Sequence, residues 1–123
     1  MDYSVRTGPR EELVSTLRRF QADRLERGES ERGSEAARAA DALERGEDGA
    51  YFERVIYAPG EADRYSVIGG DRQHVAGELA AAAAGWAHQD KPQLAAQARD
   101  ALARLEQGAD TVRVGHLLYA VRG

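Results

Sequence analysis

The side chains best suited to hold a ligand come in two pairs, each a basic residue followed three positions later by a tyrosine. Arg54 precedes Tyr57 in the same way that His116 precedes Tyr119. Aromatic rings with a few cationic contacts are typical of pockets for small molecules. We therefore treat these four as candidate ligand-binding residues. The simpler explanation is that the tyrosines belong to the core and that the basic residues are half-exposed positions on strands.

Two pairs of carboxylates could do acid–base or metal chemistry if the fold brought them together. Glu44 and Asp48 recur as Glu106 and Asp110. Both sets lie where a glycine is expected to end a helix, so local turn bonding explains them equally well. We assign no catalytic residue and no metal ligand.

Neither the histidines nor the glycines form a cofactor motif. His74 and His88 fall on one expected helix, roughly 21 Å apart at the standard helical rise, so they cannot bind the same metal. Gly69 and Gly70 stand between an expected strand and a helix, where backbone amides could hold an anion. Asp71 follows them and would repel a phosphate. We expect no cofactor, and enzymatic activity is the less favoured option.

These pairings belong to a repeat that covers the whole chain. At an offset of 62 residues, 15 of 61 aligned pairs are identical, whereas this composition predicts about six. The matches include Tyr57 on Tyr119 and residues 3–5 on residues 65–67. We interpret the chain as a single domain made of two pseudo-symmetric repeats, residues 1–61 and 63–123.

Each repeat is expected to fold as strand, helix, helix, strand. In the first repeat we expect strands over residues 3–6 and 51–57, a helix from Pro9 to near Gly28, and a second helix from a Ser34 cap to Gly46. In the second repeat we expect strands over residues 64–68 and 111–121. Its helices should cover residues 72–88 and, after a capping box at Asp90, the stretch up to residue 107.

A turn at Pro59 and Gly60 is expected to join the repeats as a hairpin that brings Tyr57 near Tyr65. If the two helices of a repeat form a hairpin, its two strands must run antiparallel. We therefore predict an α+β fold, (βααβ)₂, with a mainly antiparallel four-stranded sheet and four helices on one face. If the second helix instead crosses the first, the strands run parallel and the sheet order becomes 4-1-3-2.

An alanine run, residues 80–84, distinguishes the second repeat from the first. A helix that rests on one sheet needs only one apolar stripe, and the matching residues 18–22 are partly charged. Either this helix is packed on two sides within the chain, or its outer face contacts another subunit. The high helix propensity of alanine explains the run without any contact. We favour a homodimer interface at Ala80, Ala81 and Ala84, with Trp86 facing the core.

The composition favours a globular cytoplasmic protein. The chain is 42% hydrophobic and 31% charged, has no cysteine, and has neither a basic leader nor an apolar run of the roughly 18 residues that span a membrane. Its net charge is −4 and nearly every arginine has an acidic neighbour, which disfavours nucleic-acid binding. Arginine dominates the basic residues, a bias typical of GC-rich bacterial genomes.

We therefore expect a small noncatalytic binding or interaction protein whose partner is another protein, a second copy included. The alternative is a small-molecule-binding protein or small enzyme with its cleft at the junction of the repeats. Arg54, Tyr57, His116 and Tyr119 would line that cleft.

Overall fold

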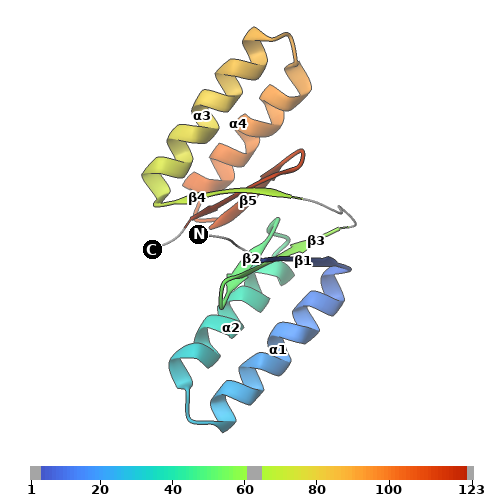
Figure 1. Ribbon diagram of the computed structural model, residues 1–123, viewed down its shortest axis with the longest axis vertical. Helices are drawn as coiled ribbons and strands as arrows, with labels where there is room; N and C mark the ends of the chain where they lie inside the picture. The colour runs from blue at the N-terminus through green and yellow to red at the C-terminus, as the bar shows by residue number, and fades with distance from the viewer. Residues whose placement is uncertain (1–3, 61–64, 122–123) are drawn as a thin grey trace. The chain divides into compact units, whose positions relative to one another are not determined.

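The computed structural model describes residues 4–60 and 65–121, which form two compact units. The first unit falls within residues 1–63 and the second within residues 64–123. Each unit has its own sheet and its own pair of helices (Figure 1). Whether the two units act as a single domain stays a prediction.

The first unit is a three-stranded mixed sheet with a helical hairpin. The strand order is β1-β3-β2, with β1 parallel to β3 and β2 antiparallel to β3. Its elements are β1 (Ser4–Gly8), α1 (Arg10–Glu26), α2 (Ser30–Glu44), β2 (Ala50–Phe52) and β3 (Val55–Pro59).

The second unit repeats this plan, with strand order β4-β6-β5. Its elements are β4 (Ser66–Gly70), α3 (Arg72–His88), α4 (Pro92–Glu106), β5 (Thr111–Val114) and β6 (Leu117–Val121). Every element begins 62 residues after its counterpart, except that β5 begins one residue earlier. This correspondence agrees with the duplication inferred from the sequence.

The prediction of one mainly antiparallel four-stranded sheet is wrong, and so is the order 4-1-3-2. The α+β class and the four helices are confirmed, but each unit has a separate three-stranded sheet. Residues 51–57 and 111–121, each expected as one strand, are hairpins that turn at residues 53–54 and 115–116. This extra reversal makes the last strand of each unit parallel to the first.

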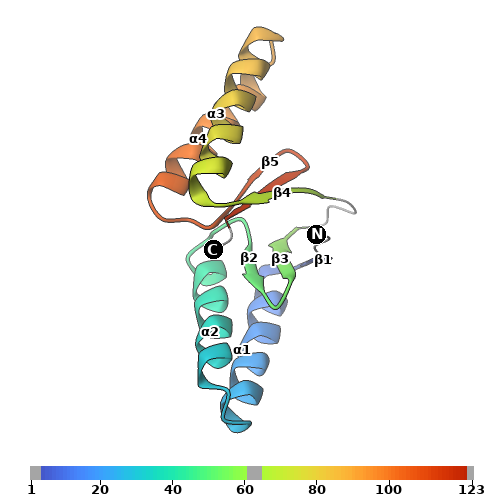
Figure 2. The same ribbon diagram turned by 60° about the vertical axis from the view of Figure 1, so that its left-hand side comes forward.

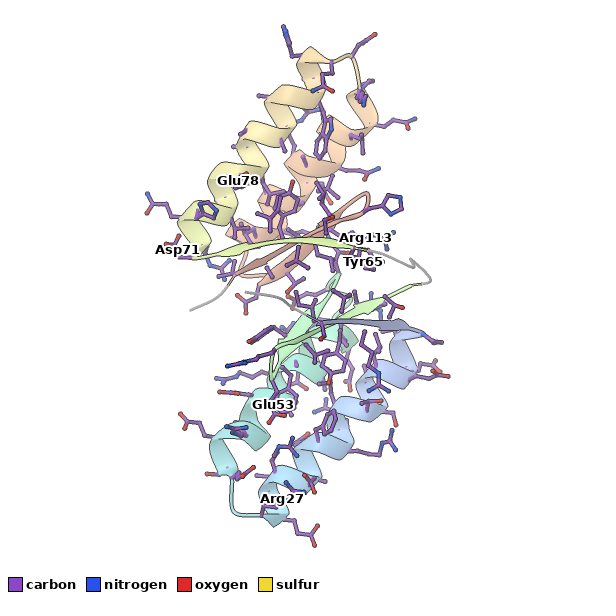
Figure 3. All side chains as sticks on the ribbon, viewed as in Figure 1. Arg27, Glu53, Tyr65, Asp71, Glu78 and Arg113 are labelled. Atoms are coloured by element: carbon purple, nitrogen blue, oxygen red, sulfur yellow. The ribbon has the colours of Figure 1, made fainter. Side chains whose placement is uncertain are left out.

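The expected hairpin between the repeats is also not formed. β3 pairs with β1 and β2, whereas β4 pairs with β6, and residues 61–64 of the expected loop lie outside the described residues. The Gly60 N–H donates to the Gly8 carbonyl (3.0 Å) and so continues the β1–β3 ladder. Tyr65 packs within its own unit, where the guanidinium carbon of Arg113 lies 5.2 Å from its ring centroid (Figure 3).

The helical hairpin of each unit covers one face of its sheet (Figure 2). Buried alanines on α2 and α4 let the helices lie close to their partners, and larger side chains fill the space above the strands. The first core contains Leu13, Leu17, Ala36, Ala40, Leu43, Phe52 and Tyr57. The second contains Val75, Leu79, Ala98, Ala101, Leu105, Val112, Val114 and Tyr119.

In both units, an arginine at the start of the first helix donates hydrogen bonds to backbone carbonyls at the end of the second helix. The last carbonyls of a helix have no partner within it. Arg10 Nη1 donates to the carbonyls of Leu43 (2.6 Å) and Glu47 (2.8 Å). Its counterpart Arg72 donates in the same way to Leu105 (2.7 Å) and Ala109 (2.9 Å).

Two predicted helix caps are corrected by the structure. α2 begins at Ser30 rather than after Ser34, and α4 begins at Pro92 after Lys91 without a side-chain cap. Asp90 does not cap α4, because it follows α3 in the left-handed conformation (φ 60). The equivalent residue of the first unit is Gly28 (φ 78).

Candidate functional site

β1 lies at one edge of its sheet, and its outward backbone groups have no strand partner among the described residues. The Ser4 N–H and the Gly8 carbonyl both bond to the β3 side of the strand, at 3.3 and 3.0 Å. Since bonding alternates along a parallel strand, the even-numbered residues of β1 face β3. The odd-numbered residues Val5 and Thr7 therefore direct their N–H and C=O groups to the outer edge.

A groove runs between this edge and α1. Its larger hollow has a volume of about 350 Å³ and is lined by Arg6, Thr16, Arg19, Phe20 and Asp23. A second hollow of about 280 Å³ shares the first three of these residues and adds Thr7, Glu12, Leu13 and Ser15. We call this set of residues the β1–α1 groove.

Arg6 and Arg19 are the cations of the groove, and both are exposed. Among the residues that the structure describes, neither guanidinium forms an ion pair or a hydrogen bond. Asp23 is already engaged, since its carboxylate pairs with Arg24 and lies 3.5 Å from Arg27 Nε. The larger hollow therefore offers positive charge to an incoming group.

The remaining walls of the groove are apolar or already hydrogen-bonded. Phe20 is half-buried, with its ring centroid 5.7 Å from that of Phe52. The Thr16 hydroxyl is buried and donates to the Glu12 carbonyl (2.9 Å). The Glu12 carboxylate lies at the opposite end from Phe20, in the smaller hollow. The groove therefore suits one oxyanion beside an apolar group, and it disfavours a second anion near Glu12.

A separate charged cluster lies where the helical hairpin of the first unit meets the β2–β3 turn. Arg24 Nε and Nη2 donate to the two carboxylate oxygens of Glu53 (3.0 and 2.7 Å), and Arg32 Nη1 donates to Glu53 Oε1 (3.1 Å). Glu53 is labelled in Figure 3 at this position. The hydrogen bonds from Arg24 hold the pKa of Glu53 below its usual value, although partial burial opposes this. Only 14% of the Arg24 side chain is exposed.

This cluster also holds a strained turn. Glu53 (φ 48) and Arg54 (φ 67) both adopt left-handed conformations, as tight two-residue hairpins require but side chains disfavour. Gly115 (φ 59) occupies the position equivalent to Glu53. The ion pairs of Glu53 explain how the first unit maintains the turn without a glycine. We therefore assign the cluster a structural role.

The predicted ligand-binding residues occupy two kinds of location. Tyr57 and Tyr119 are buried in the cores of their own units, 3% and 1% exposed, and burial raises the pKa of both hydroxyls. Near Tyr57 the positive charge of Arg6 opposes this shift. Arg54 and His116 are exposed in the hairpin turns, and Arg54 lines a hollow of about 490 Å³ with Glu31, Glu35 and Glu53 among its walls. A shared binding role for the four residues stays a prediction.

One member of each carboxylate pair considered for chemistry is bonded to an arginine of its own unit. Glu44 accepts a hydrogen bond from Arg18 (2.9 Å), and Asp110 pairs with Arg72. Both contacts lie within one unit, but each joins residues far apart in the sequence, so neither is the local turn bonding expected from the sequence. In the described ranges, no three histidine, aspartate or glutamate side chains are grouped as a metal ion would require.

The alanines predicted to form an interface lie on the solvent-exposed side of α3. Trp86 is half-buried at the margin of the second core, so it faces inward as expected. All three of Ala80, Ala81 and Ala84 are exposed, whereas Val75, Leu79 and Ala83 of the same helix are buried. Self-association through this face stays a prediction.

The β1–α1 groove was not predicted from the sequence. Arg6 is replaced by Ile68 in the second repeat, and Arg19 by Ala81. The sequence did carry one signal for these residues: Arg6, in a predicted strand, and Arg19, on a predicted helix, are positive charges that the second repeat lacks. That the two side chains line one groove follows only from the three-dimensional structure.

Comparison with known proteins does not assign the chain to a family. No family model matches the chain, and no curated protein or solved structure matches it either. Within residues 4–60 and 65–121, no helix is both long and apolar enough to cross a membrane. The chemistry of the groove is therefore the basis for a functional proposal.

Proposed function

We propose that the chain is a noncatalytic binding protein and that the β1–α1 groove of its first unit holds an anionic partner. The observation that supports this is the pair of guanidinium groups, Arg6 and Arg19, which line one groove without an ion-pair partner in the described part of the chain. Other arginines of this unit, Arg10, Arg18 and Arg24, bond to groups of the protein itself.

The groove is better suited to binding than to catalysis. A guanidinium remains protonated at physiological pH, so it donates hydrogen bonds but does not accept a proton. The Thr16 hydroxyl is buried and donates to a carbonyl within its own helix, which leaves it poorly placed as a nucleophile. Planar guanidinium groups bind carboxylates and phosphates through paired hydrogen bonds.

The direct test is thermal unfolding with a panel of small dicarboxylates, inorganic phosphate and neutral metabolites. An anion at one hundred times its dissociation constant should stabilise the fold by about 2.7 kcal/mol. The gain should vanish in the Arg6→Ala/Arg19→Ala variant. It should persist in Arg38→Ala/Arg99→Ala, which removes the same charge from exposed positions on α2 and α4.

Other outcomes of this screen point elsewhere. If no anion raises the unfolding temperature, the proposed site is wrong. A metabolite whose effect survives loss of Arg6 and Arg19 but is lost in Tyr57→Phe/Tyr119→Phe would favour the alternative, a small-molecule-binding protein or small enzyme.

Self-association is a second candidate activity, favoured by the exposure of Ala80, Ala81 and Ala84 on one helix. Small side chains let two helices approach closely, and two-fold pairing is the commonest oligomeric form. Ala81→Asp should dissociate such a homodimer and leave the circular dichroism spectrum unchanged. Sedimentation of the unaltered chain as a monomer at high micromolar concentration would rule the homodimer out.

A further inference from the structure

We infer that the anionic partner is an extended peptide segment that adds a strand at the outer edge of β1 and places one acidic side chain over the β1–α1 groove. This inference rests on the proposed function and names the class of partner that the groove would bind. Its two requirements, strand pairing and a carboxylate, are supported by different parts of the first unit.

The backbone requirement follows from the edge position of β1. Val5 and Thr7 direct two N–H groups and two carbonyls outward, with the spacing of alternate residues in an extended strand. Adding a strand at such an edge is a common mode of peptide recognition, and its affinity comes largely from main-chain hydrogen bonds. β1 contains neither a proline nor an acidic residue that would oppose pairing with an acidic peptide.

The side-chain requirement follows from the register of the sheet. Arg6 lies opposite Tyr57, whose side chain is in the core beneath the helices. Arg6 is therefore on the same face of the sheet as α1, and every second side chain of an added strand would lie on that face, over the groove. One carboxylate there can reach the guanidinium groups of Arg6 and Arg19.

The neighbours of that carboxylate in the peptide are constrained as well. Residues two positions before and after it would lie over the two ends of the groove. Phe20 at one end favours an apolar side chain, and Glu12 at the other end repels a second carboxylate. The expected segment therefore has one acidic residue, an apolar residue two positions away on the Phe20 side, and a residue that is not acidic two positions away on the Glu12 side.

The second unit provides an internal comparison. The Ser66 N–H bonds to the carbonyl of His116 (3.0 Å), so β4 has the same outward-facing backbone pattern as β1. The positions equivalent to Arg6, Thr16 and Arg19 are Ile68, Glu78 and Ala81. That surface has no cation at these positions and has the Glu78 carboxylate in place of Thr16, although His74 and Gly85 replace Glu12 and Asp23. Because it lacks both guanidinium groups, an acidic strand should bind there more weakly.

The experiment uses the full chain and a capped heptapeptide with a central glutamate, valine two residues to each side and threonine elsewhere. Binding is measured by isothermal titration calorimetry. We expect the affinity to fall at least tenfold when the glutamate is replaced by glutamine, when the three central amides are N-methylated, or in Arg6→Ala/Arg19→Ala. The Arg38→Ala/Arg99→Ala variant should bind as the unaltered chain does.

The possible results separate the inference from the proposed function. If glutarate binds at the arginines and the peptide binds no more tightly, or if N-methylation has no effect, the anion site survives and strand addition is wrong. If neither glutarate nor the peptide binds, both are wrong. Protection of the Val5 and Thr7 amides from hydrogen exchange in a peptide-free dimer would overturn the inference in favour of a second copy of the chain.

Discussion

The two units place different side chains where the helical hairpin meets the turn of the strand hairpin. In the first unit this place is charged and aromatic: Arg24 bonds to Glu53, and its guanidinium carbon lies 5.4 Å from the ring centroid of Phe20. In the second unit the equivalents of Arg24 and Glu53 are Trp86 and Gly115. One backbone arrangement therefore accepts two different sets of interactions.

In the second unit, apolar packing replaces these charged interactions. Trp86 and Leu94 pack against the second core, and a Cβ added at Gly115 would meet Leu94 Cδ2 at 3.8 Å. Leu94 corresponds to Arg32, which bonds to Glu53 in the first unit. Features that both units share maintain the fold, and the hydrogen bonds of Arg10 and Arg72 are among them. Residues that differ between the units can change surface charge and stability without changing the fold.

The largest predicted effect on stability comes from disrupting the apolar packing of Trp86 in the second unit. Trp86→Ala should lower the free energy of unfolding of the second unit by about 2–3 kcal/mol, below the full cost of a buried ring because Trp86 is only half-buried. Hydrogen exchange of backbone amides measures both units in one sample. The comparison fails if the amides of the first unit lose as much protection as those of the second.

The next largest loss of stability is expected from removing the hydrogen bonds of Arg10 and Arg72. Arg10→Ala and Arg72→Ala should each destabilise their own unit by roughly 1 kcal/mol, because each leaves helix-terminal carbonyls without a charged donor. Urea denaturation with unit-specific NMR resonances measures both losses. Arg99→Ala is the control. If only one of the two substitutions destabilised its unit, the stabilising role of this arginine would not be shared by both units.

The charged arrangement should make the first unit more sensitive to acid. The pKa of Glu53 is lowered in the folded state, so its contribution to stability is present above the unfolded-state value, about 4.3, and is lost as the pH falls through the folded-state value. We expect Glu53→Gln to weaken this dependence. The measurement is amide hydrogen exchange from pH 6 to 3 in the unaltered chain and in Glu53→Gln. An equal loss of protection in both units, with the same pH dependence in Glu53→Gln, would contradict this prediction.

The smallest effect is expected between α3 and α4. Asp90 has a left-handed backbone (φ 60) where the first unit has Gly28. Asp90→Gly should therefore stabilise the second unit by about 0.5–1 kcal/mol, and Gly28→Asp should destabilise the first unit by a similar amount. Thermal unfolding of both variants gives the signs, and a destabilising Asp90→Gly would refute the assignment of strain.

The sequence predicted those elements that have local signals. The helix expected over residues 72–88 is α3, and the structure adds that the Asp71 carboxylate caps it by accepting a hydrogen bond from the His74 N–H (2.7 Å). The offset of 62 residues correctly related the two halves element by element. The β2–β3 turn was missed because neither Glu53 nor Arg54 is a glycine or asparagine, the usual residues at left-handed positions.

The candidate site was less predictable because it depends on which charges remain without partners. Arg18, Arg19 and Arg24 are all arginines of one helix. Arg18 and Arg24 bond to carboxylates brought close by tertiary packing, whereas Arg19 has no such partner within residues 4–60 and 65–121. Sequence spacing does not reveal that difference. The parallel pairing of β1, which places Val5 and Thr7 at the outer edge, likewise depended on hairpins that the sequence did not indicate.

The measurement that tests the account most directly is a chemical-shift map of the ¹⁵N-labelled chain titrated with the central-glutamate heptapeptide. The account predicts shifts at the amides of Val5, Thr7 and Arg19. It predicts no comparable change at the equivalent positions of the second unit, Val67, Gly69 and Ala81. Equal shifts in both units, or shifts confined to the second unit, would contradict the claim that the first unit carries the binding surface.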